Sequence, residues 1–220
     1  MPRTARASVG GMCYHVINRG NTSNEVFRAN GDYHAFVDLI AHACQRLPMQ
    51  VLAYCVMPTH FHLALCPHSD GDLGRWMQWL LTTHVRRYHE HYKSRGHIWQ
   101  GRFKAFPIEQ DEHLLTVLRY IERNPLRAGL VRRAEDWPWS SLTSWLTDNE
   151  SRIVEPSPVG RPEDWASWVS HPLTIGELEQ VRQSVNRGTP YGSCEWVART
   201  AEQLGLEASL RLIGRPRKKA

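Results

Sequence analysis

The sequence predicts an α+β fold in which helices cover an antiparallel sheet. Over residues 13–131, short runs rich in β-branched and aromatic residues alternate with longer runs that have apolar residues at helical spacing. The order of these runs is strand, helix, strand, strand, helix, strand, helix. Only Pro58-Thr59 separates the second strand from the third, which predicts a hairpin. This order is typical of a ferredoxin-like sheet with helices packed on it.

Each element is predicted from its composition and its boundaries. Strands are expected at residues 13–19, 50–57, 60–65 and 103–108, and helices at residues 30–47, 73–92 and 114–123. Pro48 ends the first helix, and Asn124-Pro125 interrupts the third. Asp111 and Glu112 favour the start of the third helix because acidic side chains interact well with the N-terminal end of the helix dipole.

Beyond residue 135 the pattern is less regular. Two helical segments, 175–185 and 194–204, predict a mostly helical C-terminal extension. We therefore divide the chain into a main domain (1–135), an acidic connector rich in Trp, Pro and Ser (136–170), and a helical extension with a basic tail (171–220).

The composition indicates a globular protein of the cytoplasm. Hydrophobic residues make up 41% of the 220 residues, and nine residues are tryptophan, which is enough for a core. No apolar run approaches the roughly 18 residues of a membrane span, and no secretory signal is expected. The five cysteines contain no Cys-x-x-Cys pair, which disfavours a zinc finger and a disulfide framework. We therefore expect a cytoplasmic location and no membrane partner.

The charge is unevenly distributed along the chain. The net charge is +5, and basic stretches at 1–133 and 171–220 flank an acidic stretch at 134–170. Basic blocks of this kind are typical of proteins that bind nucleic acid, with an ordinary solvated surface as the alternative. The glycines are scattered and form no Walker-type loop, so no nucleotide cofactor is expected.

Two histidines lie two residues apart in the strand predicted at 60–65. Residues i and i+2 of a strand share one face, so His60 and His62 project side by side while Phe61 points the other way. Neutral imidazole is the commonest metal ligand in proteins, so the pair predicts part of a metal site. Two structural histidines are the alternative. A second pair, His89 and His91, lies in a predicted helix, where the rings diverge.

The second half of this site is predicted at the end of the third helix. Tyr120 and Asn124 are four residues apart and therefore share one helix face. The Asn124 amide oxygen can bind a hard metal ion. A nearby cation or metal would favour the phenolate form of Tyr120, which is the nucleophilic form. The alternative is a surface tyrosine and an asparagine that only caps the helix.

Several segments, in this order along the chain, are similar to the motifs of one protein family. They read His-Val-Ile-Asn-Arg-Gly-Asn at 15–21, Met-Pro-Thr-His-Phe-His at 57–62, Trp-Gln-Gly-Arg-Phe-Lys-Ala-Phe-Pro at 99–107 and Tyr-Ile-Glu-Arg-Asn-Pro-Leu-Arg-Ala-Gly at 120–129, with further likeness at 139–141, 188–192 and 214–218. On these segments the chain resembles the HUH-type single-tyrosine transposases, and most closely the REP-associated tyrosine transposases of bacteria. The resemblance covers nearly the whole chain.

This resemblance implies that the main domain is catalytic and has an HUH nuclease core. It implies His60, His62 and Asn124 as ligands of Mg²⁺ or Mn²⁺, and Tyr120 as the nucleophile. The implied reaction is metal-dependent cutting and strand transfer of single-stranded or hairpin DNA, at or near palindromic repeats, through a 5′-phosphotyrosine intermediate. The protein would be bacterial, nucleoid-associated, and a monomer or homodimer. A non-cleaving hairpin-binding regulator and an HUH replication or relaxase-type nickase are the alternatives.

Basic and aromatic residues close to the predicted site in sequence, and in the tail, are the candidate DNA contacts. They are Arg19, Trp99, Arg102, Lys104, Arg119, Arg123, Arg215 and Arg217. Trp99 could stack on a base, with burial in the core as the alternative. The Gly-Arg-Pro segment of the tail could follow a DNA backbone or minor groove, or be a solvated basic end.

Overall fold

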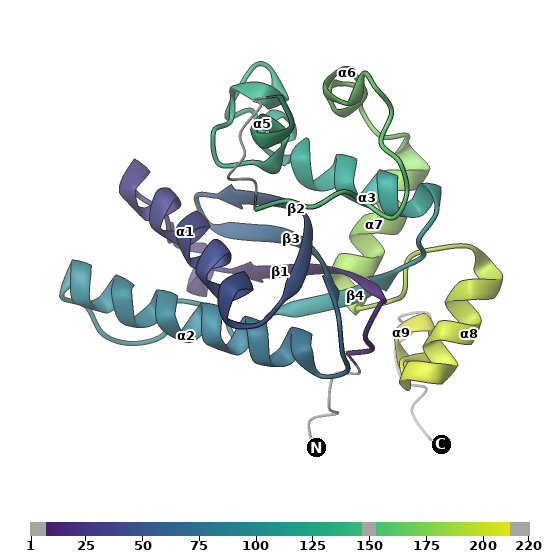
Figure 1. Cartoon of the computed structure of the whole chain (residues 1–220), viewed down its shortest axis with the longest axis horizontal. Coiled ribbons are helices and arrows are strands. Elements are labelled where there is room, and N and C mark those ends of the chain that lie inside the picture. Colours follow the sequence, from purple (N-terminus) through teal and green to yellow (C-terminus); the bar gives the residue numbers. More distant parts are fainter. Residues whose placement is uncertain (1–7, 147–152, 212–220) are drawn as a thin grey trace, which may run out of the picture.

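The four predicted strands form one antiparallel sheet. A computed structural model describes residues 8–146 and 153–211, and Figure 1 shows their arrangement. The strands are β1 (Cys13–Arg19), β2 (Met49–Met57), β3 (His60–Pro67) and β4 (Lys104–Ile108). Their order across the sheet is β2-β3-β1-β4, so β1 and β3 are the central strands. The predicted hairpin is the β2–β3 pair.

Helices cover both faces of this sheet (Figure 1). The helices α1 (Asn30–Arg46) and α2 (Asp72–Tyr92) pack on one face, and α3 (Glu112–Glu122) packs on the other. The predicted α+β class is therefore confirmed. Element boundaries differ from the predicted ones by a residue or two. For example, α3 begins early because the Asp111 side chain caps it by accepting a hydrogen bond from the His113 amide.

Alternation along β3 decides which side chains face which helices. Phe61, Leu63 and Leu65 are fully buried in the core beneath α1 and α2. His60 and His62 point the other way, toward α3, because successive residues of a strand face opposite sides of the sheet. The alternation thus reserves one face of β3 for the core and the other for polar side chains.

The elements after α3 pack beside it, against β2 and along β4 (Figure 1). They are α4 (Asn124–Arg127), the 3₁₀ turn Ala134–Asp136, α5 (Ser141–Leu146), α6 (Trp165–Ser170), α7 (Ile175–Arg187), α8 (Cys194–Leu204) and α9 (Glu207–Leu210). Another 3₁₀ turn, Asn21–Ser23, follows β1. Tyr191 adds to the edge strand β4 through backbone hydrogen bonds of 2.9 Å with Pro107 and Glu109. Within the described residues, no helix combines the length and the apolar character needed to cross a membrane.

The described part of the connector is anchored to α3 by a buried carboxylate. Glu122 is fully buried, and its oxygens accept hydrogen bonds of 2.5 Å from Ser141 Oγ and Trp165 Nε1. The Arg161 guanidinium lies 3.6 Å from the same carboxylate. Burial raises the pKa of Glu122 above its ordinary value, although Arg161 and the two hydrogen bonds oppose this shift. Glu122 therefore joins three separate parts of the connector to α3.

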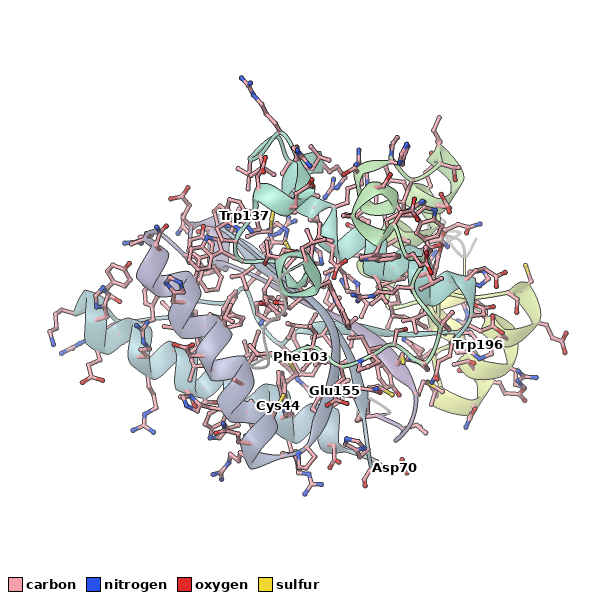
Figure 2. The ribbon with its side chains drawn as sticks, turned by 45° about the horizontal axis from the view of Figure 1, so that its top comes forward. Cys44, Asp70, Phe103, Trp137, Glu155 and Trp196 are labelled. Carbon is pink, nitrogen blue, oxygen red and sulfur yellow. The ribbon has the colours of Figure 1, made fainter. Side chains whose placement is uncertain are left out.

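A second set of contacts joins the start of the connector to β2. Trp137, labelled in Figure 2, donates from its indole Nε1 to the Val56 carbonyl at 2.9 Å. The Val56 amide in turn donates to the Trp139 carbonyl at 2.9 Å. The connector is thus attached to the main domain in its described part, while the division of the chain at residues 135 and 170 stays a prediction.

Replacing Glu122 with alanine tests this anchor. The change removes both hydrogen bonds and leaves the Arg161 side chain, which is 10% exposed, without its carboxylate. Breaking a buried ion pair from one side costs about 3–5 kcal/mol, so we expect the free energy of unfolding in urea to fall by that amount. Glu90→Ala, at an exposed position of α2, is the control and should change it by less than about 0.5 kcal/mol. Similar values for the two variants would show that Glu122 is not an anchor.

A buried histidine lies in the core on the other face of the sheet. His84 of α2 is 4% exposed, and its ring centroid is 5.1 Å from that of Phe36 and 5.3 Å from that of Trp99. Its Nδ1 has no hydrogen-bond partner among the described residues. Burial lowers the pKa of His84 to about 4, because a charged imidazole would lose its hydration here.

His84 makes stability depend on pH. The unfolded chain takes up this proton near pH 6.5 and the folded chain only near pH 4, so the unfolded state binds more protons between these values. Stability therefore falls as the pH falls through this window. We expect the loss of unfolding free energy between pH 7 and pH 4 to be smaller in His84→Leu than in the parent, by about 3 kcal/mol. Urea unfolding at each pH measures this difference, and an identical pH dependence in both proteins would contradict it.

Candidate active site

Three imidazoles meet on the sheet face that α3 covers. The strands β1 and β3 are antiparallel neighbours, with Ile17 opposite His62 and Arg19 opposite His60. The ring centroid of His15, on the same face of β1, is 5.0 Å from that of His62, and the two ring planes are within 8° of parallel. The His60 and His62 centroids are 4.9 Å apart. The predicted histidine pair is thus a cluster of three.

In both histidines that are predicted as ligands, Nδ1 is the nitrogen that takes part in a hydrogen bond. His62 Nδ1 lies 2.9 Å from His15 Nε2, and His60 Nδ1 lies 3.0 Å from the Thr59 hydroxyl. These bonds leave Nε2 of each ring for another partner. Metal-binding histidines commonly use one ring nitrogen for the ion and the other for a hydrogen bond that fixes the ring.

All three imidazoles are held in the neutral form. Burial, together with the positive charges of Arg19 and Arg127, lowers the pKa of His60 to about 4. Burial also lowers the pKa of His15 to about 3 and that of His62 well below its ordinary value. Neutral imidazole is the form that binds a metal, so protons do not compete for these nitrogens at neutral pH.

The helix α3 brings Tyr120 to these rings. Its ring centroid is 5.7 Å from that of His62 and 6.1 Å from that of His15, and both contacts are edge-on. Tyr120 is 6% exposed. The structure therefore places Tyr120 beside the paired histidines, across the sequence distance that separates β3 from α3. Its role as the nucleophile stays a prediction.

Asn124 follows Tyr120 at the start of α4 and is fully buried. Its amide nitrogen donates to the Tyr120 carbonyl at 3.1 Å, and its oxygen accepts a hydrogen bond of 2.5 Å from Arg127. The Arg127 guanidinium carbon also lies 5.6 Å from the centroid of the Tyr120 ring. The oxygen predicted to bind a metal is therefore occupied here by an arginine donor.

Neither His15 nor Arg127 is among the site residues predicted from the sequence. Both occur in segments that carry the family resemblance. The strand period places His15 and Ile17 on one face of β1, but the register of β1 against β3 decides whether that face meets His62. For Arg127, the turn of α4 after Pro125 directs the side chain back to Asn124.

The residues present fit a divalent cation. His60 and His62 offer neutral imidazole nitrogens, and the Asn124 amide oxygen, which accepts from Arg127 with one lone pair, has a second lone pair for an ion. This donor set suits Mn²⁺ or Mg²⁺. Three protein donors leave coordination positions for substrate oxygens. The assignment of these residues as ligands stays a prediction.

A second group of possible metal ligands follows the C-terminal end of β4. The side-chain ligand atoms of Glu109, Asp111 and His113 are all within 4.8 Å of one another. Two of these side chains have structural partners, because Asp111 caps α3 and Glu109 accepts a hydrogen bond from the Ser193 amide at 2.7 Å. This cluster could hold a divalent ion, but it is separate from the histidines.

Three of the predicted DNA contacts line one cleft. Arg19, Arg102 and Lys104 are exposed and border a cavity of about 280 Å³. Its other walls include Ile17, the strand partner of His62, and Asn186 near the end of α7. The cleft is therefore basic and adjoins the sheet positions that carry the histidines.

The other described candidates have partners inside the protein. Trp99 is 6% exposed in the core beneath α1 and α2, where Phe103 (labelled in Figure 2) is also buried. Arg119 is buried, forms an ion pair of 3.1 Å with Glu177, and has its guanidinium carbon 4.6 Å from the centroid of the Trp168 ring.

Arg123 donates to the Val169 carbonyl at 3.0 Å and to the Ser170 carbonyl. Burial or internal contacts engage the side chains of Trp99, Arg119 and Arg123 in this structure, and their contact with DNA stays a prediction. Arg215 and Arg217 lie outside the described residues.

Comparison with known proteins identifies the family. The family model described as "Transposase IS200 like" matches residues 8–124. A Haemophilus influenzae protein that carries the name of a REP-associated tyrosine transposase is 31% identical over 133 residues, which are 56% of this chain and 69% of that protein. The REP-associated tyrosine transposase of Escherichia coli K12 is 25% identical over 135 residues, which are 60% of this chain and 77% of that protein.

A solved structure has the same fold. It contains a REP-associated tyrosine transposase bound to a REP hairpin, and it aligns with a TM-score of 0.55 at 20% identity, over 79% of this chain and 99% of that chain. At this identity the likeness shows the fold alone. The family match, however, spans more than half of the chain and includes His60, His62, Tyr120 and Asn124. The chain therefore belongs to the IS200-like transposases, with tyrosine transposases among its relatives.

Proposed function

We propose that this protein is a metal-dependent DNA strand transferase that cuts single-stranded DNA at or near hairpins. The observation that supports this most strongly is the position of Tyr120, whose ring lies edge-on to two neutral imidazoles. Ile17, the strand partner of one of these histidines, lines the basic cleft. A nucleophile, a set of metal donors and a phosphate-binding surface are the three parts that such a reaction needs. The relative of known structure was bound to a REP hairpin, which supports hairpin DNA as the substrate class.

In the proposed reaction the Tyr120 oxygen attacks a phosphorus atom of the DNA backbone. The phenol gives up its proton to solvent, the new oxygen–phosphorus bond forms, the bond from phosphorus to the 3′ oxygen breaks, and the departing 3′ oxygen takes up a proton from solvent. The products are a 5′-phosphotyrosine and a free 3′-hydroxyl. Attack by a 3′-hydroxyl on the phosphotyrosine reverses these changes and seals a strand. The number of phosphodiester bonds is conserved, so no nucleotide cofactor is required.

The residues around Tyr120 would orient the reacting groups. A Mg²⁺ or Mn²⁺ ion held by His60, His62 and Asn124 would supply positive charge next to the non-bridging oxygens of the phosphate. Arg127 holds the Asn124 amide and presents an exposed cation beside Tyr120. We propose that Arg127 also contacts the phosphate, because a guanidinium binds phosphate oxygens well.

The basic cleft would bind the strand that flanks the cut. Arg19 lies opposite His60 in the sheet, and Arg102 and Lys104 continue the positive surface from β1 to β4. A DNA backbone could run from the exposed cations of the cleft to the imidazoles. No Asp or Glu lines the cleft, so no carboxylate there would repel the phosphates. This arrangement suits a flexible single strand better than a rigid duplex.

Replacing Tyr120 with phenylalanine tests the nucleophile. The ring and its contacts with His15 and His62 are kept, while the oxygen that would attack phosphorus is removed. With a labelled hairpin oligonucleotide and Mn²⁺, we expect the parent to give a cut product and a covalent protein–DNA band on a denaturing gel. The variant should give neither but should still bind the hairpin.

Tyr88→Phe is the matched control, since Tyr88 is a buried tyrosine in the other core. It should cut like the parent. Equal cutting by Tyr120→Phe would show that the nucleophile is another residue. A parent that binds the hairpin and never cuts it would instead support a non-cleaving regulator.

The salt dependence of DNA binding tests the cleft. Each phosphate contact that is lost makes the slope of log Kobs against log salt concentration less steep by roughly 0.7 for single-stranded DNA. We therefore expect the double variant Arg102→Ala/Lys104→Ala to bind more weakly and to have a slope less steep by roughly 1.4. Arg87→Ala, at an exposed position of α2 on the other face of the sheet, should keep the parent slope. Fluorescence anisotropy over a salt series measures the slopes, and equal slopes in the two variants would contradict the proposal.

A further inference from the structure

We propose that His15 is a positioning residue that sets the orientation and tautomer of His62, so that His62 can bind the metal. This inference rests on the proposed function, because it assumes that His62 is a metal ligand. His15 would itself touch neither the ion nor the DNA. It would act only through its hydrogen bond to His62 Nδ1.

The geometry is that of two rings joined by a single N–H···N hydrogen bond. His15 Nε2 and His62 Nδ1 are 2.9 Å apart, and the two ring planes are within 8° of parallel. His15 is fully buried, with its ring centroid 4.9 Å from that of Phe106 and 6.1 Å from that of Tyr120. Because packing holds His15 in place on β1, its hydrogen bond adds a fixed partner that restricts rotation of the His62 ring.

The same bond links the tautomers of the two rings. A neutral imidazole has one nitrogen with a proton and one with a lone pair. If His15 Nε2 donates, then the His62 proton is on Nε2, which cannot bind a metal in that form. If His62 Nδ1 donates, then His62 Nε2 has the lone pair and the His15 proton is on Nδ1. Metal binding at His62 Nε2 therefore requires His15 to be the acceptor.

The arrangement in which His62 Nδ1 donates has an energetic cost at His15 Nδ1. His15 Nδ1 is buried and has no hydrogen-bond partner among the described residues. In the metal-binding arrangement this atom becomes an N–H group without an acceptor, and buried N–H groups of that kind are rare in proteins. We therefore infer that the metal-free protein favours the arrangement in which His15 donates, and that metal binding reverses the hydrogen bond.

Variants of His15 separate its hydrogen bond from its packing. His15→Leu fills the site but cannot accept a hydrogen bond, whereas the side-chain oxygen of His15→Gln can accept one from His62 Nδ1. We expect Mn²⁺, followed by electron paramagnetic resonance in the absence of DNA, to bind roughly 10–100-fold more weakly to the Leu variant, the range typical of lost outer partners of metal ligands. The Gln variant should recover most of this loss.

His84→Leu is the matched control. His84 is also a buried histidine whose Nδ1 has no partner among the described residues, but it lies in the core on the other face of the sheet. The same substitution there should lower stability and leave the Mn²⁺ dissociation constant unchanged. Equal constants in the parent and His15→Leu would overturn the role of His15 alone. Equal losses in the Leu and Gln variants would show that His15 acts only by packing, which also overturns the inference.

A measurement on the unchanged protein serves if a His15 variant does not fold. Nitrogen-15 NMR of the histidine rings distinguishes a protonated nitrogen from one with a lone pair. On addition of Mg²⁺ we expect His15 Nδ1 to change to the protonated type and His15 Nε2 to the lone-pair type. Unchanged His15 resonances, with Mg²⁺ bound, would overturn the inference. A parent protein that binds neither ion would overturn the proposed metal site, and the role of His15 with it.

Discussion

The packing of α3 across one face of the sheet is the constraint on which the rest of the site depends. The imidazoles of β1 and β3 are fixed by strand register, but Tyr120 reaches them only because α3 lies over that face. The helix is held there by a stripe of buried apolar residues that form one core with the inward side chains of β2 and β3. A small rotation of α3 about its axis would turn Tyr120 away from the rings while the sheet stayed unchanged.

Burial and nearby positive charge both lower the pKa values of His60 and His62. The imidazoles are neutral because they are buried, and the positive charges of Arg19 and Arg127 also lower the pKa values of His60 and His62. For His62, the neighbouring rings of His60 and His15 act in the same direction. No carboxylate is among the causes that shift the pKa values of these two rings. The metal donors are neutral and the nearby charged residues are arginines. A bound cation would therefore add to the positive charge, and neither of these two rings has a carboxylate that compensates it. Under the proposed function, the phosphodiester supplies that charge.

Local patterns predicted those parts of the site whose geometry is local. The period of two along β3 was sufficient to place His60 and His62 on one face, and the helical spacing of four related Tyr120 to Asn124. The order and the approximate ends of the strands and long helices followed from apolar periodicity and from prolines. The meeting of these two halves was implied by the family resemblance, because no local pattern determines which helix packs over which strand.

Long-range contacts account for what the sequence did not predict. From the sequence, Arg119 cannot be told apart from an arginine that binds DNA. In the structure it pairs with Glu177, which is far away in sequence. Trp99 could as easily have been a base-stacking residue as a core residue, and only its packing against Phe61 decides between them. His15 was part of a recognised segment, but its role depends on the register between β1 and β3. In each case the deciding partner belongs to another element.

Two arginines that were expected to bind DNA, Arg119 and Arg123, hold the end of α3. Arg119 contacts Glu177 and Trp168, and Arg123 donates to the backbone at Val169, so the end of α3 is held by segments that come much later in the chain. Glu122, between these two arginines, holds the connector in the same way. Tyr120 lies on this same stretch of helix and faces the sheet. The C-terminal segments therefore help to fix the distance and rotation of the tyrosine relative to the histidines, because the three residues that they hold, Arg119, Glu122 and Arg123, are within three residues of it.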